Sequence, residues 1–478
     1  NGKWVIVAPI QLEYQAKGNV RLTPVDNGKS IIVKDKNETD EQAAGKYAAN
    51  DVTDDGNIVV GGVGGYTAEI FKGKPAYWNR QTQTWTQLPL PEGYVYGEVF
   101  CVTPDGKYAV GRALDSNESS FDCKRYGVMW DLTTNTIVDL PNRPVIPCEG
   151  AYMETISNMS ADGRYLIFYG NQMYAPLAYM YDRKTQKSVK LGYEGTNLPK
   201  DVVQLDAAVP GISFNGKYVV YRVNDKDDNI YFCVYNTETG ANTVYNGNDD
   251  QQVIVDFIDN DGNIYGSTPF NTPVRDFYVR NNGLWYPFSM ILKQAYGIDF
   301  EKYTSLSNTG TLNGLSADAK SFSLMVSPTG ESYVVTMPDH ISDACNSINL
   351  LEDYTTTPAA DAEFSTIETV QLVFGYNITV KGGATSVLLK DESGKTVRKS
   401  LAVAVDKTNA NTLVVTFRAT NLEAGKKYTV EIPAGTVALA GNTEKTNKDI
   451  TVNYRGRANK PVGITEVFPV DHSTLSRI

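Results

Sequence analysis

The chain repeats one short phrase at intervals of about fifty residues. The phrase reads T-D-D-G-N-I-V-V-G at 53–61, T-P-D-G-K-Y-A-V-G at 103–111 and S-A-D-G-R-Y-L-I-F at 160–168. When the copies are aligned on the turn glycine, they fall at Gly2, Gly56, Gly106, Gly163, Gly216 and Gly262, with Ala319 in the last copy. Self-similarity at such a period is the signature of a propeller or a solenoid, in which each repeat is one supersecondary unit.

Each repeat predicts four antiparallel strands. A short strand ends at Ser or Thr, the x-[D/N]-G turn follows, and an apolar strand comes next. The third strand has an aromatic centre, as in P-A-Y-W-N at 75–79, and the fourth ends in Leu-Pro or Leu-Gly. A sheet of this kind has two apolar faces, which a ring of neighbouring sheets buries. The 30 tyrosines of the chain suit such an all-β fold.

We count seven repeats and predict a seven-bladed β-propeller over residues 1–340. The first repeat begins at its second strand, and the last, 311–337, shows three strands without a clear fourth. Six blades is the alternative, if strands from the N-terminus complete the last blade. Because the chain begins inside a repeat, we also expect a preceding N-terminal segment, such as an export signal.

Residues 53–89 contain D-D-G-N-I-V-V-G, then P-A-Y-W, then W-T-Q-L-P. This order resembles the HAF-type, WD-like repeats of bacterial extracellular propellers. The resemblance covers most of residues 1–340, and it implies a secreted or surface-exposed propeller. It supplies no catalytic residues.

The composition changes after Pro338, where aromatic residues become rare. We predict a linker at 341–356 and a β-sandwich at 357–456, with strands near 395–405, 411–418 and 427–432. Leu422-x-x-Gly425-x-x-Tyr428 resembles a tyrosine corner, and the region resembles the bacterial Ig-like domains of S-layer-type surface proteins. Residues 457–478 are predicted to be a linker and the start of a further Ig-like unit, or an extra strand.

The charge and cysteine content exclude several classes of function. With a net charge of −11 and no Lys/Arg cluster, we expect neither nucleic acid nor anionic lipid as a partner. No run of 18 apolar residues predicts a membrane span. With two histidines and no C-x-x-C pair, the sequence predicts no zinc site. We expect an exported, monomeric protein at the bacterial cell surface or outside the cell.

Two questions remain open from the sequence: a disulfide bond and a calcium site. Cys123 and Cys148 fall in loops on the same face of one repeat, so a disulfide between them is geometrically possible. The acidic runs at 224–229 and 259–262 invite a Ca²⁺ interpretation, but solvated turns explain them better because the second run lacks the first aspartate of a calcium loop.

The long loops between second and third strands and between repeats lie together on one face, which we take as the candidate ligand-binding face. It carries tyrosines beside carboxylates, a combination that suits sugar rings: Tyr66, Tyr94, Tyr96, Glu98, Tyr152 and Glu154. The alternative is that these tyrosines only fill loops and blade seams. The sequence shows no G-x-S-x-G elbow and no histidine within 1–339 to act as a general base.

We therefore expect a non-enzymatic surface protein of the adhesion type. Its propeller would present a binding face for a glycan or a protein, and the Ig-like unit would act as a spacer. A polysaccharide-active glycoside hydrolase or lyase that uses carboxylates at the channel mouth is the alternative function. A purely structural ring on which a partner protein docks is the third.

Overall fold

The structure is a computed structural model of the whole chain. It describes residues 3–7, 18–26, 28–64, 73–116, 124–148, 151–152, 154–170, 177–192, 202–205, 209–225, 227, 229–246, 253–268, 277–299, 311–326, 331–381 and 386–457. The chain divides between Ile348 and Asn349 into two compact units, and both consist mainly of antiparallel β-sheets.

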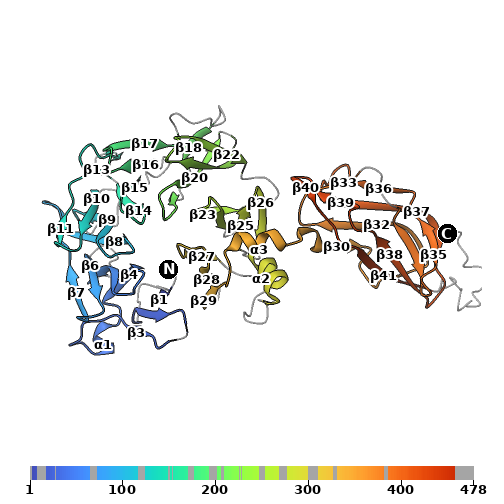
Figure 1. Cartoon of the computed structure of the whole chain (residues 1–478), viewed down its shortest axis with the longest axis horizontal. Coiled ribbons are helices and arrows are strands. Elements are labelled where there is room, and N and C mark those ends of the chain that lie inside the picture. Colours follow the sequence, from blue (N-terminus) through green and yellow to red (C-terminus); the bar gives the residue numbers. More distant parts are fainter. Residues whose placement is uncertain are drawn as a thin grey trace, which may run out of the picture. The chain divides into compact units, whose positions relative to one another are not determined.

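Seven sheets, numbered here 1 to 7, follow one another along the described part of the first unit (Figure 1). Sheets 1 to 3 consist of β1 (Trp4–Val7), β2 (Arg21–Pro24) and β3 (Ile31–Ile32); of β4 (Tyr47–Val52), β5 (Ile58–Val63), β6 (Lys74–Asn79) and β7 (Thr84–Gln87); and of β8 (Tyr96–Val102), β9 (Tyr108–Leu114), β10 (Arg125–Asp131) and β11 (Thr136–Ile137). A two-stranded ribbon, β12 (Pro147–Cys148) with β13 (Ala151–Tyr152), precedes sheet 4.

Sheets 4 and 5 consist of β14 (Thr155–Met159), β15 (Tyr165–Gly170), β16 (Leu177–Asp182) and β17 (Lys187–Leu191); and of β18 (Val202–Leu205), β19 (Gly211–Ile212), β20 (Tyr218–Asp225), β21 (Ile230–Asn236) and β22 (Asn242–Asn246). Sheets 6 and 7 consist of β23 (Ile254–Ile258), β24 (Ile264–Ser267), β25 (Phe277–Asn281) and β26 (Leu284–Pro287); and of β27 (Thr311–Leu315), β28 (Ser321–Val326) and β29 (Glu331–Thr336). The first strands, such as β4, β8 and β14, lie innermost in Figure 1, so the arrangement is propeller-like.

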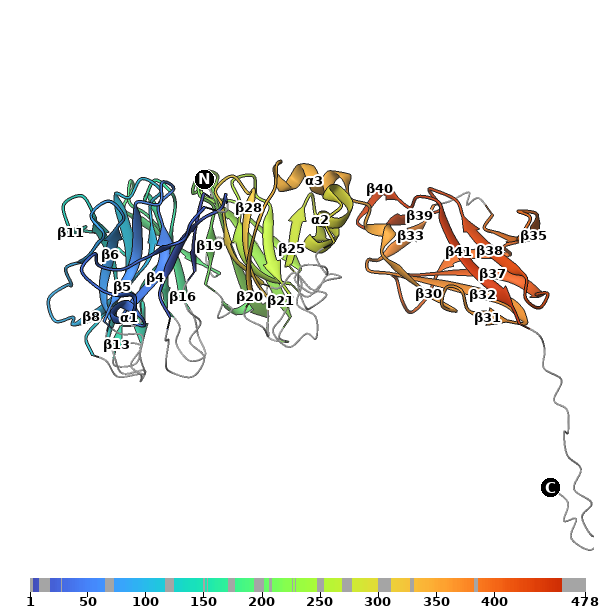
Figure 2. The same cartoon turned by 90° about the horizontal axis from the view of Figure 1, so that it is seen from below.

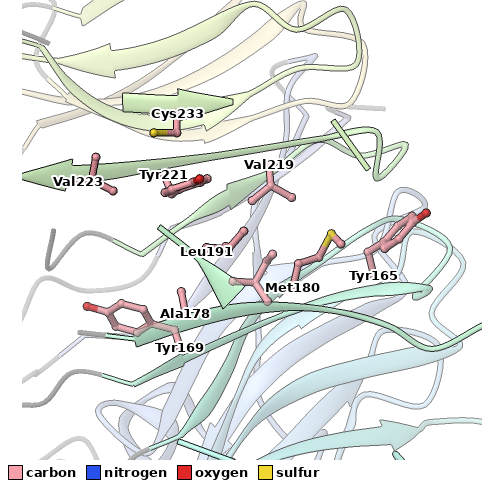
Figure 3. Packing of buried hydrophobic residues seen from close by; sticks show 10 residues of the cluster. Tyr165, Tyr169, Ala178, Met180, Leu191, Val219, Tyr221, Val223 and Cys233 are labelled. Carbon is pink, nitrogen blue, oxygen red and sulfur yellow. The ribbon is translucent and has the colours of Figure 1, made fainter. Parts of the chain in front are cut away.

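Adjacent sheets pack face to face because their second strands are apolar on both sides. Side chains alternate along a strand, so successive residues enter opposite interfaces. Val59 packs between sheets 1 and 2, whereas Val60 packs between sheets 2 and 3. Val219 likewise joins Tyr165, Ile167 and Met180 between sheets 4 and 5 (Figure 3), and its neighbour Val220 faces sheet 6.

The aromatic residue of the third strand ties each of three sheets to the sheet before it. The Trp78 and Trp130 indole nitrogens donate to the carbonyl oxygens of Lys34 and Pro89, each at 2.8 Å. The Tyr181 hydroxyl donates to the Pro141 carbonyl oxygen at 2.5 Å. The aromatic residue of one repeat therefore contacts the Leu-Pro end of the repeat before it.

The repeated turn is held by its Ser or Thr. In sheet 2 the Thr53 N–H donates to the Ile58 carbonyl, while the Thr53 hydroxyl accepts from the Ile58 N–H and donates to Asp55. Gly56 has a φ of +69°, which an L-residue rarely adopts. Sheet 6 has Asp259 at the position of the hydroxyl residue, and its carboxylate binds Asn263 and Tyr265 instead.

In the described part of this unit, three short helices accompany the sheets: α1 (Asp40–Ala43), α2 (Phe288–Tyr296) and α3 (Ile341–Ser347). The apolar spacing at 288–303 predicts a helix, and α2 occupies its first part. It buries Phe288, Ile291 and Leu292, and Phe288 packs on Phe322 of sheet 7 at 5.1 Å between ring centroids.

The second unit has the two larger sheets expected of a sandwich. One contains β30 (Tyr354–Thr357), β32 (Thr366–Phe374), β37 (Thr412–Asn421) and β36 (Ala402–Val405). The other contains β31 (Glu363–Phe364), β41 (Ile450–Gly456), β38 (Lys427–Ile432), β34 (Leu388–Asp391) and β35 (Thr396–Lys399). A small sheet of β33 (Ile378–Val380), β39 (Val437–Leu439) and β40 (Asn442–Thr446) completes the unit.

The segment treated above as a linker, 341–356, contains regular structure. It comprises α3, a single 3₁₀ turn at Leu350–Glu352 and most of β30. The Tyr428 hydroxyl accepts a hydrogen bond from the Glu423 backbone N–H at 2.9 Å, the contact expected of a tyrosine corner. Residues 458–478 lie outside the described residues, so the predicted further unit or extra strand does too.

The contact between an indole and the preceding sheet predicts a measurable loss of stability. Trp130→Phe removes the indole donor to the Pro89 carbonyl in a buried site, so we expect the free energy of unfolding of the first unit to fall by about 1–3 kcal/mol. Trp85→Phe is the matched control, since the Trp85 indole nitrogen has no hydrogen-bond partner among the described residues. Urea unfolding followed by circular dichroism measures both, and equal losses would contradict the role of the hydrogen bond.

The tyrosine corner predicts a similar effect in the second unit. Tyr428→Phe removes the acceptor of the Glu423 N–H, which is supplied by a buried tyrosine, so we expect the free energy of unfolding of residues 349–478 to fall by about 1–2 kcal/mol. Tyr354→Phe serves as control because no hydrogen bond of its hydroxyl occurs within the described residues. Thermal unfolding of the full chain, with the two transitions assigned from the variants, is the measurement.

Candidate functional site

The inner strands of five sheets carry a β-bulge at the same place in the repeat. The register shifts at the residue six positions before the turn glycine or its Ala319 equivalent: Asn50, Phe100, Ser157, Asp256 and Asn313. A bulge leaves its extra residue out of the ladder and redirects its side chain. Sheet 5 has Pro210 at this position, just before β19. The bulges thus form one belt around the inner edges of the sheets.

The belt surrounds a cavity of about 630 Å³. Its walls come from the inner strands of sheets 2 to 7 and include four of the bulge residues. The cavity extends from Arg112 and Arg125 at one end of the sheets to Pro104 and Phe214 in the turns at the other end. A second cavity of about 420 Å³ adjoins these walls and is lined by β1, β4, β27 and β28.

Hydrogen bonds join neighbouring inner strands at the level of the belt. The Asn50 amide donates to the Val99 carbonyl at 2.7 Å, and the Asp51 carboxylate accepts from the Val102 N–H at 2.9 Å. In the next interface the Cys101 thiol donates to the Ser157 carbonyl at 3.5 Å. These bonds hold the bulged backbone, so the cavity wall is preformed.

The wall combines aromatic faces with groups that bind hydroxyls. The Arg112 guanidinium lies 3.2 Å from the Glu98 carboxylate and 5.3 Å from the centre of the Phe100 ring. Phe214 and Phe257 add further aromatic surface, and Asn158 and Asn313 add amides to the same cavity. Aromatic rings stack on the apolar faces of sugars, while amide and guanidinium groups bond their hydroxyls.

The sequence-predicted tyrosines occupy different environments from one another. Tyr94 is half-buried and packs on Tyr126, with 5.6 Å between ring centroids, in the core between sheets 2 and 3. The Lys74 ammonium lies 5.1 Å from the centre of the half-buried Tyr96 ring. Tyr66 lies outside the described residues, and Tyr152 is described only as a backbone position of β13.

The two predicted carboxylates are each held by an arginine. Glu98 binds Arg112 and also accepts from the Asn50 amide at 3.1 Å. Glu154 is buried, forms an ion pair with Arg143, and is 2% exposed. The Arg143 guanidinium lies 3.8 Å from the centre of the Tyr126 ring, and its burial lowers its pKa. Glu154 therefore has a clear structural role between sheets 3 and 4.

The remaining sequence predictions concern cysteines and acidic turns. Cys123 lies outside the described residues, and Cys148 is described only as part of β12, so their pairing stays a prediction. In the acidic runs, the Asp225 and Asp259 carboxylates accept backbone hydrogen bonds from their own turns. Among the residues that the structure describes, no three acidic, His or Cys side chains gather as a metal site would require.

Sequence reasoning missed the bulge residues and Arg112. The bulge residues do have a signal in the sequence, because each bulge stands at a fixed distance before the turn glycine. The residue types at that position differ, however, so only the alignment of the repeats on their turns would have identified them.

Comparison with known proteins supports the description of the second unit. Residues 353–455 match the bacterial Ig-like domain family. No curated protein matches the chain significantly. Within the described residues, no helix is long and apolar enough to cross a membrane.

The solved structures that resemble the chain are distant. TolB from Acinetobacter baumannii shares 15% identity over 59% of this chain and 60% of its own, with a TM-score of 0.36. An oligogalacturonate lyase in complex with manganese shares 13% identity over 67% of this chain and 83% of its own, with a TM-score of 0.43. Dipeptidyl peptidase 4 from Porphyromonas gingivalis shares 9% identity over 90% of this chain and 63% of its own, with a TM-score of 0.39. The chain thus spans about 60% of the TolB chain.

Two carboxylates near the belt predict a pH-dependent stability. Burial raises the pKa of Asp51 to about 6, and burial likewise raises that of Asp256 to about 6 against the opposing effect of Arg222. The folded state therefore binds the protons of the Asp51 and Asp256 carboxyl groups more tightly than the unfolded state does. The stabilisation by these protonated groups is complete below about pH 4 and is lost as the pH rises through about 6.

The Asp51→Asn/Asp256→Asn double variant removes this dependence. We expect the unfolding midpoint of the native protein to fall, relative to that of the variant, between about pH 4.5 and about pH 7.5. The substitutions also remove carboxylate acceptors of hydrogen bonds. This loss changes the midpoint of the variant at both pH values, so it cancels when the change in midpoint between the two pH values is compared. A difference that stays constant with pH would contradict the raised pKa values.

Proposed function

We propose that this protein is a bacterial cell-surface binding protein that holds a glycan in the cavity within the belt of bulges. The observation that carries the proposal is the composition of the cavity wall, in which Phe100, Phe214 and Phe257 stand among amide and guanidinium groups. Pockets that bind small molecules have this combination of apolar surface with a few polar groups, and a volume of several hundred Å³.

The proposed architecture is a seven-bladed propeller followed by an Ig-like spacer. Seven successive sheets with buried interfaces support seven blades, and six of them line the cavity with their inner strands. The surface location is supported by the match at 353–455, because bacterial Ig-like domains occur in surface proteins. Export of the protein and its monomeric state are parts of the same proposal.

We propose binding without catalysis. Glycoside hydrolysis needs a pair of carboxyl groups, one as acid and one as base or nucleophile. Glu98 and Glu154, the carboxylates predicted from the sequence on the candidate ligand-binding face, are each engaged by an arginine. This pairing favours a structural role for both side chains over proton transfer.

A glycan-array screen of the purified full chain tests the proposal. We expect binding to one glycan class and a loss of affinity of about tenfold or more for Phe214→Ala/Phe257→Ala, since the variant removes two stacking faces. Tyr96→Ala is the matched control outside the cavity wall, and thermal unfolding verifies that all proteins fold.

Three outcomes would contradict the proposal. The absence of binding to any glycan would contradict carbohydrate recognition and leave a protein ligand as the alternative. Loss of binding in Tyr96→Ala alone would move the site to the face of long loops. Cleavage of the bound glycan, detected by new reducing ends or unsaturated products, would make the protein an enzyme.

A further inference from the structure

At one end of the sheets, the end where α3 also lies, hydrogen bonds join the repeated turns of neighbouring sheets (Figure 2). The donor stands two residues before the turn glycine: the Asp54 N–H donates to the Pro104 carbonyl at 3.3 Å, and the Ala161 N–H donates to the Phe214 carbonyl at 2.7 Å. In sheet 3 this position is Pro104, which has no N–H to donate to sheet 4. The interface between sheets 3 and 4 therefore lacks a bond that joins sheet 2 to sheet 3 and sheet 4 to sheet 5.

A cavity of about 640 Å³ lies at this end of the interface between sheets 3 and 4. Its walls come from the turns on either side and from the Leu-Pro end of sheet 3. Four cationic side chains and two carboxylates line it: Lys107, Arg164, Arg183, Lys184, Asp139 and Asp162. We call this cavity the basic groove. Its lining carries more positive than negative groups, whereas the whole chain has a net charge of −11.

Arg183 is held in a fixed position in the groove. Its guanidinium lies 4.6 Å from the centre of the Tyr108 ring, and its Nη1 donates to the Gly163 carbonyl at 2.8 Å. A guanidinium has five N–H donors, so these two contacts orient the group and leave donors for a ligand. The Lys107 ammonium lies 5.0 Å from the centre of the same ring. Tyr108 thus supports two cations, a role different from that of a stacking surface for a sugar.

The four cations differ in their partners. Arg164 donates with Nε and Nη2 to the two oxygens of the buried Asp182 carboxylate, at 2.9 and 2.8 Å, so its charge is neutralised within sheet 4. In the part of the chain that the structure describes, no carboxylate forms an ion pair with Lys107, Arg183 or Lys184. Both lysines are exposed. An oriented guanidinium and two exposed ammonium groups are therefore available to a ligand.

We propose that the basic groove binds an acidic segment of a partner protein. A Glu or Asp carboxylate fits the planar fork of Arg183, while the ammonium groups of Lys107 and Lys184 attract further carboxylates as point charges. Asp139 and Asp162 on the same walls repel a polymer that is charged at every unit, such as a polyuronate, whereas a peptide can place uncharged residues beside them. Binding at this groove does not require the glycan cavity, which lies along the inner strands. The sequence shows no Lys/Arg cluster because the four cations come from three separate segments.

Fluorescence anisotropy with the full chain and a labelled Glu-Gly-Glu-Gly-Glu-Gly peptide tests the groove. We expect saturable binding that weakens as salt is added, because salt screens exposed charges, and no binding of the Gln-Gly-Gln-Gly-Gln-Gly peptide. Arg183→Gln/Lys184→Gln should lower the affinity by about tenfold or more, since it removes two of the three available cations. Because Arg183 also holds the turn at Gly163, Lys107→Gln/Lys184→Gln is a second variant that leaves the turn contact intact, and we expect a loss of about fivefold.

Arg80→Gln/Lys36→Gln is the matched control. The Arg80 guanidinium lies 4.6 Å from the centre of the Trp4 ring in the same way, and the double variant changes the net charge equally at another interface. We expect this control to bind the Glu peptide as the native protein does, and thermal unfolding verifies that all variants fold. Equal losses in the control and the groove variants would overturn the groove as the site, and no binding of the Glu peptide at low salt would overturn the proposal. Tighter binding of an oligogalacturonate, lost in the groove variants, would make the groove a glycan site instead.

Discussion

The burial of both faces of each sheet is the constraint on which the first unit depends. A four-stranded sheet with apolar residues on both sides is stable only between two partners. Adjacent residues of one strand, such as Val59 and Val60, belong to different cores, so the alternation along the second strand joins three sheets at once. The hydrogen bonds of Trp78 and Trp130 then fix the positions of sheets 2 and 3 against the sheets before them.

This packing removes the faces of the sheets from contact with ligands and leaves their edges accessible. The faces are covered, and the turns that carry the repeated phrase are occupied by their own Ser or Thr contacts. The inner edge is different, because a bulge there frees a side chain without disturbing the faces. Asn50, Phe100 and Ser157 stand at equivalent positions yet differ completely in chemistry. One scaffold position can therefore vary while the cores between the sheets remain unchanged.

The difference between the core and the edge explains how much the sequence could predict. The turns, the apolar strands and the aromatic third strands have repeated residue types, so the order of the sheets and the tyrosine corner at Tyr428 follow from the sequence. The site does not, since the bulge position has no common residue type. Tyr94 and Glu154 illustrate the same limit: their partners, Tyr126 and Arg143, are distant in the chain or join different sheets.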